Sequence, residues 1–278
     1  MPISNLTTCL DLLASSGIVL SHEQKAVLET SLPLKKVEAG LKMIKFWGKF
    51  ITVNGKDYLL AIGLVDQPYV FDGNVHMQYK YFYSQNGVHW LDLGPLDEVT
   101  YGRAGTINGF LTGEPGHKYV VEEPAPEVET PEGEEPPAEE AEGEEGEEKT
   151  GPEPLKFDVT EVQRLRFMME NIQSGTGLVP DGYYTTNAKN EIAANQLFAG
   201  LPYPDKLESF THGPLGCSIK KDVTGSWSLH RDSFKCLTIL RSLAYPGYSF
   251  VYSCDMKEFD SIYLGDGQAN KDLMFMIA

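Results

Sequence analysis

The spacing of hydrophobic positions changes along the chain, from a helical period in the first forty residues to a strand-like one from Leu41 onward. Leu6, Leu10 and Leu13 fall on one face of a predicted helix. Ser21 to Gln24 matches a capping box and precedes another apolar run. We therefore expect the chain to begin with helices.

The following stretch predicts an antiparallel meander. Leu41 to Leu64 is rich in β-forming residues and is interrupted by Asn54-Gly55, a strong hairpin signal. Asn86-Gly87 turns a further strand toward Trp90, which we also expect on a strand, and Asn108-Gly109 marks another turn. The strand before Asn86 carries alternating tyrosines that share one face: Tyr79, Tyr81 and Tyr83.

The helical period returns near residue 160, where Thr160 is a good N-cap. Apolar residues then repeat at three- and four-residue spacing, and Gly175 and Gly177 end the helix. We expect a second helix from Asn187 to Leu197 and a short one from Pro204 to Phe210. The last fifty residues predict four strands: Ser226–His230, Cys236–Leu243, Tyr248–Cys254 and Phe259–Leu264.

These patterns predict an α+β fold, mainly antiparallel β-sheet with N-terminal and mid-chain helices. Residues 1–120 form a half with helices and a meander, and residues 156–278 form a half with helices and C-terminal strands. A length of 278 residues allows one large domain. We expect the two halves to pack together as one domain, and the pattern leaves open whether they share one sheet.

Residues 121–155 separate the two halves and predict a disordered acidic loop. Glu122 to Glu153 holds 15 glutamates and one lysine, a net charge of −14 within the chain's −17. Seven prolines lie between Val121 and Leu155, and no aromatic residue occurs between Tyr119 and Phe157. Such a segment buries too little apolar surface to offset the entropy of ordering it.

Outside this insert the chain is nearly neutral, which argues against binding to nucleic acids or to anionic membrane surfaces. No apolar run approaches the roughly 18 residues of a membrane helix. No lysine or arginine precedes Lys25, so a secretory signal peptide is not expected. The four cysteines form no Cys-x-x-Cys pair and indicate a reducing compartment.

The chain shows no recognisable catalytic or metal-binding pattern. The histidines are isolated, and none has the spacing of a zinc site. Gly175-Thr176-Gly177 follows a helix rather than a strand, so we interpret it as a helix stop rather than a phosphate loop. We therefore expect no enzyme activity, no metal and no cofactor.

Large aromatic residues at turns and strands are the remaining candidates for function. They are suited either to fill the core or to anchor a partner, since interface anchors are typically Trp, Tyr and Arg. Arg241 also fits an internal charge-assisted hydrogen bond. The candidate core or interface anchors are Trp47, Tyr58, Trp90, Trp227, Arg241 and Tyr245.

The order of these aromatic and glycine motifs resembles the family of radial spoke head proteins 4, 6 and 9. No single motif is specific, but their order and spacing together cover nearly all the chain except the insert. The motifs are Phe46-Trp47-Gly48-Lys49, Asp57-Tyr58, Tyr83-Ser84 with Trp90, Gly109-Phe110, Gly113-Glu114-Pro115, Val179-Pro180, Trp227, Leu240-Arg241-Ser242, Pro246-Gly247 and Tyr263-Leu264-Gly265.

The resemblance implies a non-enzymatic subunit of the radial spoke head in the axoneme of motile cilia and flagella. It implies head subunits resembling proteins 4, 6, 1 and 10 as partners, transient contact with central-pair projections, and a relay of that contact to dynein. Two other classes remain open: a small-ligand-binding α+β domain, and an acidic chaperone for basic proteins that acts through the insert.

The role of the insert itself is also open. It is suited to act as a charged brush on the head surface, with repulsion over a Debye length of about 8 Å. Its glycine-spaced glutamates, Glu142 to Glu148, resemble the acidic tails of tubulins, so glutamate or glycine chains are a second hypothesis. A tolerated loop without a role is the third.

Overall fold

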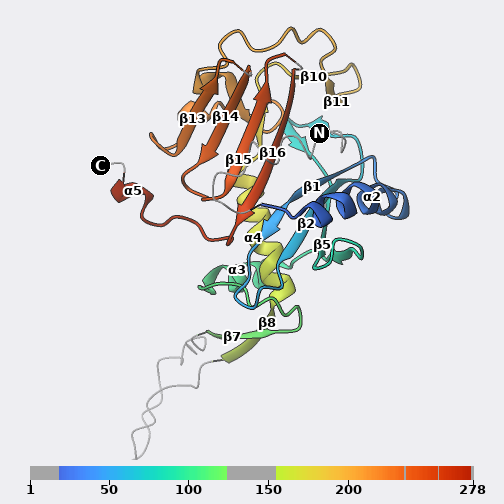
Figure 1. Cartoon of the computed structure of the whole chain (residues 1–278), viewed down its shortest axis with the longest axis vertical. Coiled ribbons are helices and arrows are strands. Elements are labelled where there is room, and N and C mark those ends of the chain that lie inside the picture. Colours follow the sequence, from blue (N-terminus) through green and yellow to red (C-terminus); the bar gives the residue numbers. More distant parts are fainter. Residues whose placement is uncertain (1–18, 124–154, 235, 256, 277–278) are drawn as a thin grey trace, which may run out of the picture.

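The computed structural model describes residues 19–123, 155–234, 236–255 and 257–276 and has the α+β fold that the sequence predicts (Figure 1). The predicted helix through Leu6, Leu10 and Leu13 lies outside these residues, as does Cys9. So does most of the acidic insert, residues 124–154.

One mixed sheet of eight strands forms the centre, in the order β13-β14-β15-β16-β1-β2-β5-β6. All neighbours are antiparallel except β1 and β16, which are parallel. The two halves of the chain therefore share one sheet. Its strands are β1 (Met43–Phe50), β2 (Tyr58–Leu64), β5 (Tyr79–Ser84), β6 (Leu91–Leu93), β13 (Trp227–Asp232), β14 (Leu237–Ser242), β15 (Tyr248–Ser253) and β16 (Glu258–Gly265).

Helices pack on both faces of this sheet. Helix α4 (Glu161–Thr176) is capped by Thr160 and Gln163 and buries Leu165 and Met169 in the larger apolar cluster, with Trp47 of β1. Helix α2 (His22–Glu38) starts with the predicted capping box of Ser21 and Gln24 and contributes to the cluster on the opposite face. The alternation of β1 explains both clusters, because successive strand residues point to opposite faces.

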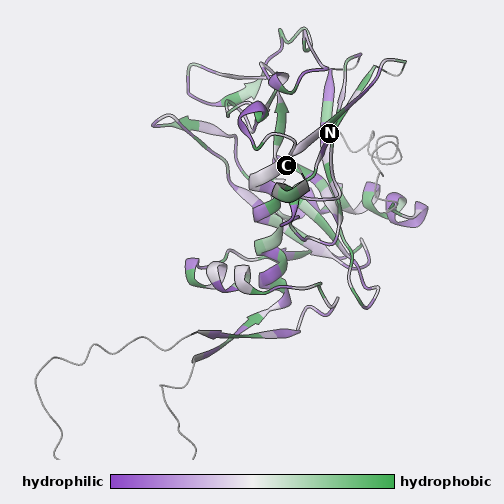
Figure 2. Ribbon diagram, turned by 90° about the vertical axis from the view of Figure 1, so that its left-hand side faces the viewer, coloured by the Kyte–Doolittle hydropathy of each residue, from purple (hydrophilic) through white to green (hydrophobic). Residues whose placement is uncertain are grey.

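The remaining elements connect and extend this body. Strands β7 (Lys118–Glu123) and β8 (Leu155–Thr160) form a two-stranded arm that projects away from the sheet (Figures 1 and 2). The arm shows that strand pairing continues at least to Glu123 and Leu155. The short elements are β3 (Tyr69–Phe71), β4 (Asn74–His76), α3 (Glu98–Thr106), β9 (Leu178–Pro180), β10 (Tyr184–Thr186), β11 (Ile192–Ala194), η2 (Leu207–Ser209), β12 (Phe210–His212), η3 (Ile219–Lys221) and α5 (Leu273–Met276).

The predicted helix from Asn187 to Leu197 is wrong. This stretch is the turn and second strand of the β10–β11 hairpin. Asn190 adopts a left-handed conformation with φ of 60°, and its N–H donates to the carbonyl of Asn187. Asparagine tolerates this conformation and favours turns, so the local turn outweighs the helical spacing of the apolar residues.

Two further predictions need correction. Helix α3 interrupts the expected meander. Its Val99, Gly102 and Gly105 are poor helix formers, so the sequence did not predict a helix there. Trp90 precedes β6 instead of lying on a strand. Among the described residues, no helix has both the length and the apolar character needed to cross a membrane.

Candidate functional site

A cleft of about 880 Å³ lies on the α4 side of the sheet, near the start of β1 and β16. Strands β1, β2 and β5 supply its floor, with Ile62, Leu64 and Tyr81. The last turn of α4 and the β9–β11 segment form one wall, and the first residues of β16 form another. The cleft thus draws on both halves of the chain.

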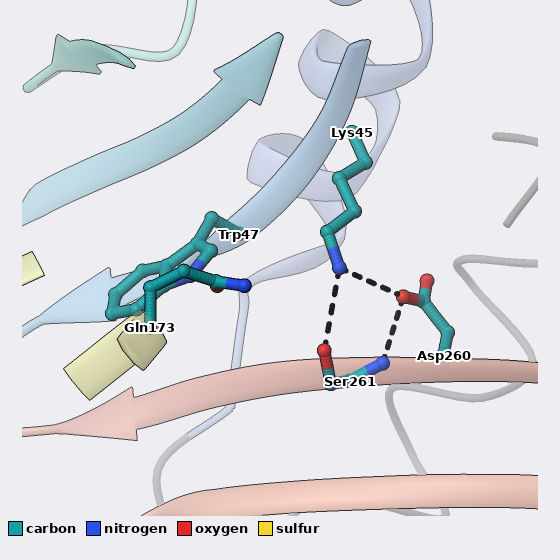
Figure 3. A network of polar contacts seen from close by, with 5 residues as sticks. All are labelled: Lys45, Trp47, Gln173, Asp260 and Ser261. Atoms are coloured by element: carbon teal, nitrogen blue, oxygen red, sulfur yellow. Dashed lines mark hydrogen bonds and ion pairs between the residues drawn. The ribbon is translucent and has the colours of Figure 1, made fainter. Parts of the chain in front are cut away.

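Polar side chains bridge the space between β1 and β16 (Figure 3). Lys45 Nζ lies 3.5 Å from Asp260 Oδ1 and donates to Ser261 Oγ at 3.3 Å. Asp260 Oδ1 also accepts from the backbone N–H of Ser261 at 2.7 Å. Next to this group, Trp47 Nε1 donates to Gln173 Oε1 at 2.7 Å, which ties β1 to the end of α4.

Three of the tyrosines that line the cleft are Tyr79, Tyr81 and Tyr184. Burial raises the pKa of Tyr184 to about 12 and also raises the pKa of Tyr79 and Tyr81. Arg166 lies over the Tyr81 ring, 3.7 Å from its centroid, and pairs with Glu170. These phenols therefore remain neutral at physiological pH and act as hydrogen-bonding and packing groups.

His212 lies at the same cleft, where its Nε2 is 2.7 Å from Asp222 Oδ2. The same carboxylate oxygen accepts from Trp227 Nε1 at 2.7 Å. His212 Nδ1 is buried without a hydrogen-bond partner. Within the described residues, no group of three or more His, Cys, Asp or Glu side chains is arranged to hold a metal ion.

A second polar centre joins the arm to the body. Glu161, fully buried at the start of α4, accepts from five donors: Tyr58 Oη at 2.8 Å, Thr112 N at 2.9 Å, Thr112 Oγ1 at 2.5 Å, Gly113 N at 2.7 Å and Tyr119 Oη at 2.9 Å. Burial alone raises the pKa of a carboxyl, but the hydrogen bonds of Thr112, Tyr58 and Tyr119 outweigh it and hold the pKa of Glu161 below its ordinary value.

The structure does not gather the six candidate anchors into one site. Trp47, Tyr58 and Trp227 belong to the larger apolar cluster, and Trp90 belongs to the other, where its Nε1 donates to Ser31 Oγ at 3.1 Å. All four are buried within the chain. Arg241 and Tyr245 are half-buried. Their role as core or interface anchors stays a prediction.

Replacing Trp227 by alanine is expected to lower the free energy of unfolding by about 3–5 kcal/mol, because it removes a buried ring beside Tyr248 and the donor to Asp222. Urea unfolding of the isolated chain measures this. Phe234→Ala is the control, since that ring is 95% exposed, and its effect should stay within about 0.5 kcal/mol. Wild-type stability combined with lost partner binding would instead place Trp227 at an interface.

Sequence reasoning missed Glu161, Lys45 and Asp260. A glutamate after an N-cap threonine is ordinary, because acidic residues favour the first turn of any helix. Lys45 and Asp260 are 215 positions apart, and neither belongs to a recognisable motif. These residues acquire their roles from neighbours that are remote in the chain.

Comparison with known proteins supplies the remaining information. No family model matches the chain. Proteins named radial spoke head protein 9 homolog are similar to it over the full length of both chains: 29% identical over 305 residues in Danio rerio, 27% over 301 in Mus musculus and 26% over 301 in Homo sapiens. The resemblance carried by the aromatic and glycine motifs is confirmed, since the chain is similar over its whole length to proteins named radial spoke head protein 9 homolog.

Proposed function

We propose that this protein is a structural subunit of the radial spoke head in the axoneme of motile cilia and flagella. The observation that carries the proposal is the likeness to radial spoke head protein 9 homologs along the whole of both chains. The sequence supports the same conclusion with its aromatic motifs, its nearly neutral body and cysteines that form no Cys-x-x-Cys pair. The proposed partners are the other head subunits, resembling proteins 4, 6, 1 and 10.

Rigidity is the physical property that such a subunit needs. A head that passes contact with the central pair toward dynein must not deform under that contact. The single sheet joins both halves of the chain, and α2 and α4 pack on opposite faces of it. Edge-to-face ring pairs such as Trp47 with Phe50 add specific geometry to the core. A permanent assembly of this kind would bury about 2,000 Å² or more.

The cleft is the observation that favours the ligand-binding alternative, since its volume lies in the range of small-molecule sites. Its charged groups weaken that alternative. Lys45 is paired with Asp260, and Glu170 with Arg166. These charges are already neutralised by one another, whereas a small-molecule site needs convergent polar groups directed at the ligand.

Affinity purification of the tagged full chain from motile ciliated cells tests the proposal. We expect the other spoke head subunits to co-purify in near-constant ratio and to resist salt, since an obligate interface is largely apolar. Recovery of the chain alone would contradict a head role. Recovery with basic proteins that disappears when residues 122–153 are deleted would favour the chaperone alternative.

A further inference from the structure

Two cysteines lie opposite each other at one end of the C-terminal strands. The last pair in the ladder of β14 and β15 is Leu237 with Ser253. One step beyond that pair, the N–H of Cys254 donates to the carbonyl of Cys236 at 2.9 Å. This hydrogen bond continues the ladder, so the backbones of Cys236 and Cys254 occupy directly opposite positions.

The two cysteines belong to neighbouring turns of the same form. Cys236 ends the turn between β13 and β14, and Cys254 begins the turn between β15 and β16. Each turn ends on a left-handed residue, Cys236 with φ of 50° and Lys257 with φ of 54°. Because the cysteines are not close in sequence, the pairing of the strands is what brings them together.

The backbone at the two positions fits a disulfide. In a hydrogen-bonded antiparallel pair the two Cα atoms are about 5.5 Å apart, and a disulfide joins Cα atoms roughly 4.4–6.8 Å apart. The Cβ atoms of such a pair are about 4.5–5.5 Å apart, slightly more than the roughly 3.5–4.5 Å of a disulfide. Closing the bond therefore needs a small local shift, and a strained disulfide is the more easily reduced.

The neighbours of the Cys236 thiol agree with this placement. The Asp255 carboxylate, through its charge and a hydrogen bond, is the main cause that raises the pKa of Cys236. The Cys254 thiol lies close enough to raise that pKa as well, whereas Arg231 acts in the opposite direction. Both cysteine side chains are partly exposed, so an oxidant in solution reaches them.

We propose that Cys236 and Cys254 are a redox pair that forms a reversible disulfide with oxidised glutathione as the oxidant. One cysteine thiolate attacks a glutathione sulfur, which forms a mixed disulfide and releases one reduced glutathione. The other cysteine thiolate then attacks the protein sulfur of the mixed disulfide and releases the second. The two protein thiols thereby lose two electrons and two protons, which reduce the oxidised glutathione.

The bond would fasten the outer hairpin of the central sheet. Strand β13 is the last strand on its side of the sheet and pairs with β14 alone among the described strands. A disulfide would tie the β13–β14 turn directly to the β15–β16 turn. In a reducing compartment such a bond is transient, as redox-sensing disulfides are. The inference does not depend on the proposed function.

Mass spectrometry of the full chain tests the pairing. The reduced chain is incubated with oxidised glutathione, its remaining thiols are blocked with iodoacetamide, and it is digested with trypsin without reduction. Trypsin cuts after Lys235, Arg241 and Lys257, so the expected product is peptide 236–241 joined to peptide 242–257. Excess reduced glutathione, added before the block, should remove the link.

A third cysteine supplies an internal control. Cys236 is 18 positions from Cys254 and 19 positions from the exposed Cys217, so loop length favours neither partner. In the folded chain we expect the link to Cys254 in at least about tenfold excess over the link to Cys217, because the backbone geometry fits only the first. The chain unfolded in urea should lose this preference.

Asp255→Asn tests whether the carboxylate controls the thiol. Without that charge the pKa of Cys236 falls, and the disulfide should form about threefold faster at pH 7, because the thiolate fraction rises more than its nucleophilicity falls. Asp97→Asn, on an exposed carboxylate at the start of α3, should leave the rate unchanged.

Thermal unfolding measures the effect of the bond on the fold. Oxidation should raise the melting temperature of the wild type by about 5 °C, since the link closes a loop in the unfolded chain. Cys236→Ser should show no such rise, whereas Cys217→Ser should behave like the wild type.

Two results would overturn the inference. Glutathione retained on Cys236 or Cys254 without the link between them would show that the thiols do not reach each other. Equal links from Cys236 to Cys254 and to Cys217 in the folded chain would show that the fold does not select the pair. A selective link without co-purifying spoke head subunits would keep this inference and reject the proposed function.

Discussion

Glu161→Gln is expected to lower the free energy of unfolding by about 3 kcal/mol, which is the range for removing one partner from a buried charged network. The carboxylate accepts five hydrogen bonds from Tyr58, Thr112, Gly113 and Tyr119. Glutamine has the same shape, but an NH2 group that donates replaces one carboxylate oxygen that accepts. This NH2 group then faces the N–H and O–H donors around position 161. Urea unfolding near pH 7 measures the loss.

The same residue gives a pH dependence whose sign follows from its pKa. The folded-state pKa of Glu161 lies below its unfolded value, so its contribution is complete above the unfolded pKa of about 4.3 and is lost as the pH falls through the folded pKa. The stability gap between wild type and Glu161→Gln should therefore narrow on acidification from pH 7 toward pH 3. A gap that widens in acid would contradict this assignment.

Glu122→Gln is the matched control for the charge change. Glu122 lies on the arm and pairs with Lys156 at 3.4 Å, but both side chains are more than half exposed. Exposed ion pairs contribute about 0–1 kcal/mol, so this variant should unfold like the wild type. If Glu161→Gln and Glu122→Gln have the same free energy of unfolding, Glu161 does not hold the arm to the body.

Gly48→Ala is expected to disrupt the junction between the two halves and to cost at least about 3 kcal/mol, the upper part of the range for overpacking. A Cβ at this position would lie 2.1 Å from the backbone oxygen of Tyr263. That oxygen belongs to β16, which cannot move away without breaking the parallel ladder between β1 and β16. Urea unfolding and hydrogen exchange of the amides at 48–50 measure the effect.

Gly102→Ala controls for the glycine substitution itself. Gly102 lies in α3, and a Cβ there would meet nothing within 4 Å. Alanine is favoured over glycine in helices by about 0.5–1 kcal/mol, so this variant should be slightly more stable than the wild type. If Gly48→Ala were equally well tolerated, the close packing of β1 on β16 would not be what joins the halves.

Local chemistry made much of this fold predictable. The capping box at Ser21, the N-cap at Thr160 and the turn at Asn54-Gly55 each depend on residues within a few positions, and all lie where the sequence places them. The four C-terminal strands appear within one or two residues of their predicted bounds. The wrong helix prediction for Asn187–Leu197 also has a local cause, because the turn preference of asparagine outweighs the helical spacing of the apolar residues there.

The sequence by itself determined the α+β class, the period of most elements and the absence of a recognisable catalytic motif, because these follow from neighbours along the chain. Only the tertiary structure decided that both halves share one sheet, that Glu161 gathers donors from remote segments, and that β1 and β16 diverge around Lys45 and Asp260. These contacts join residues 42 to 215 positions apart and leave no local pattern, so no periodicity, cap or turn signal can specify them.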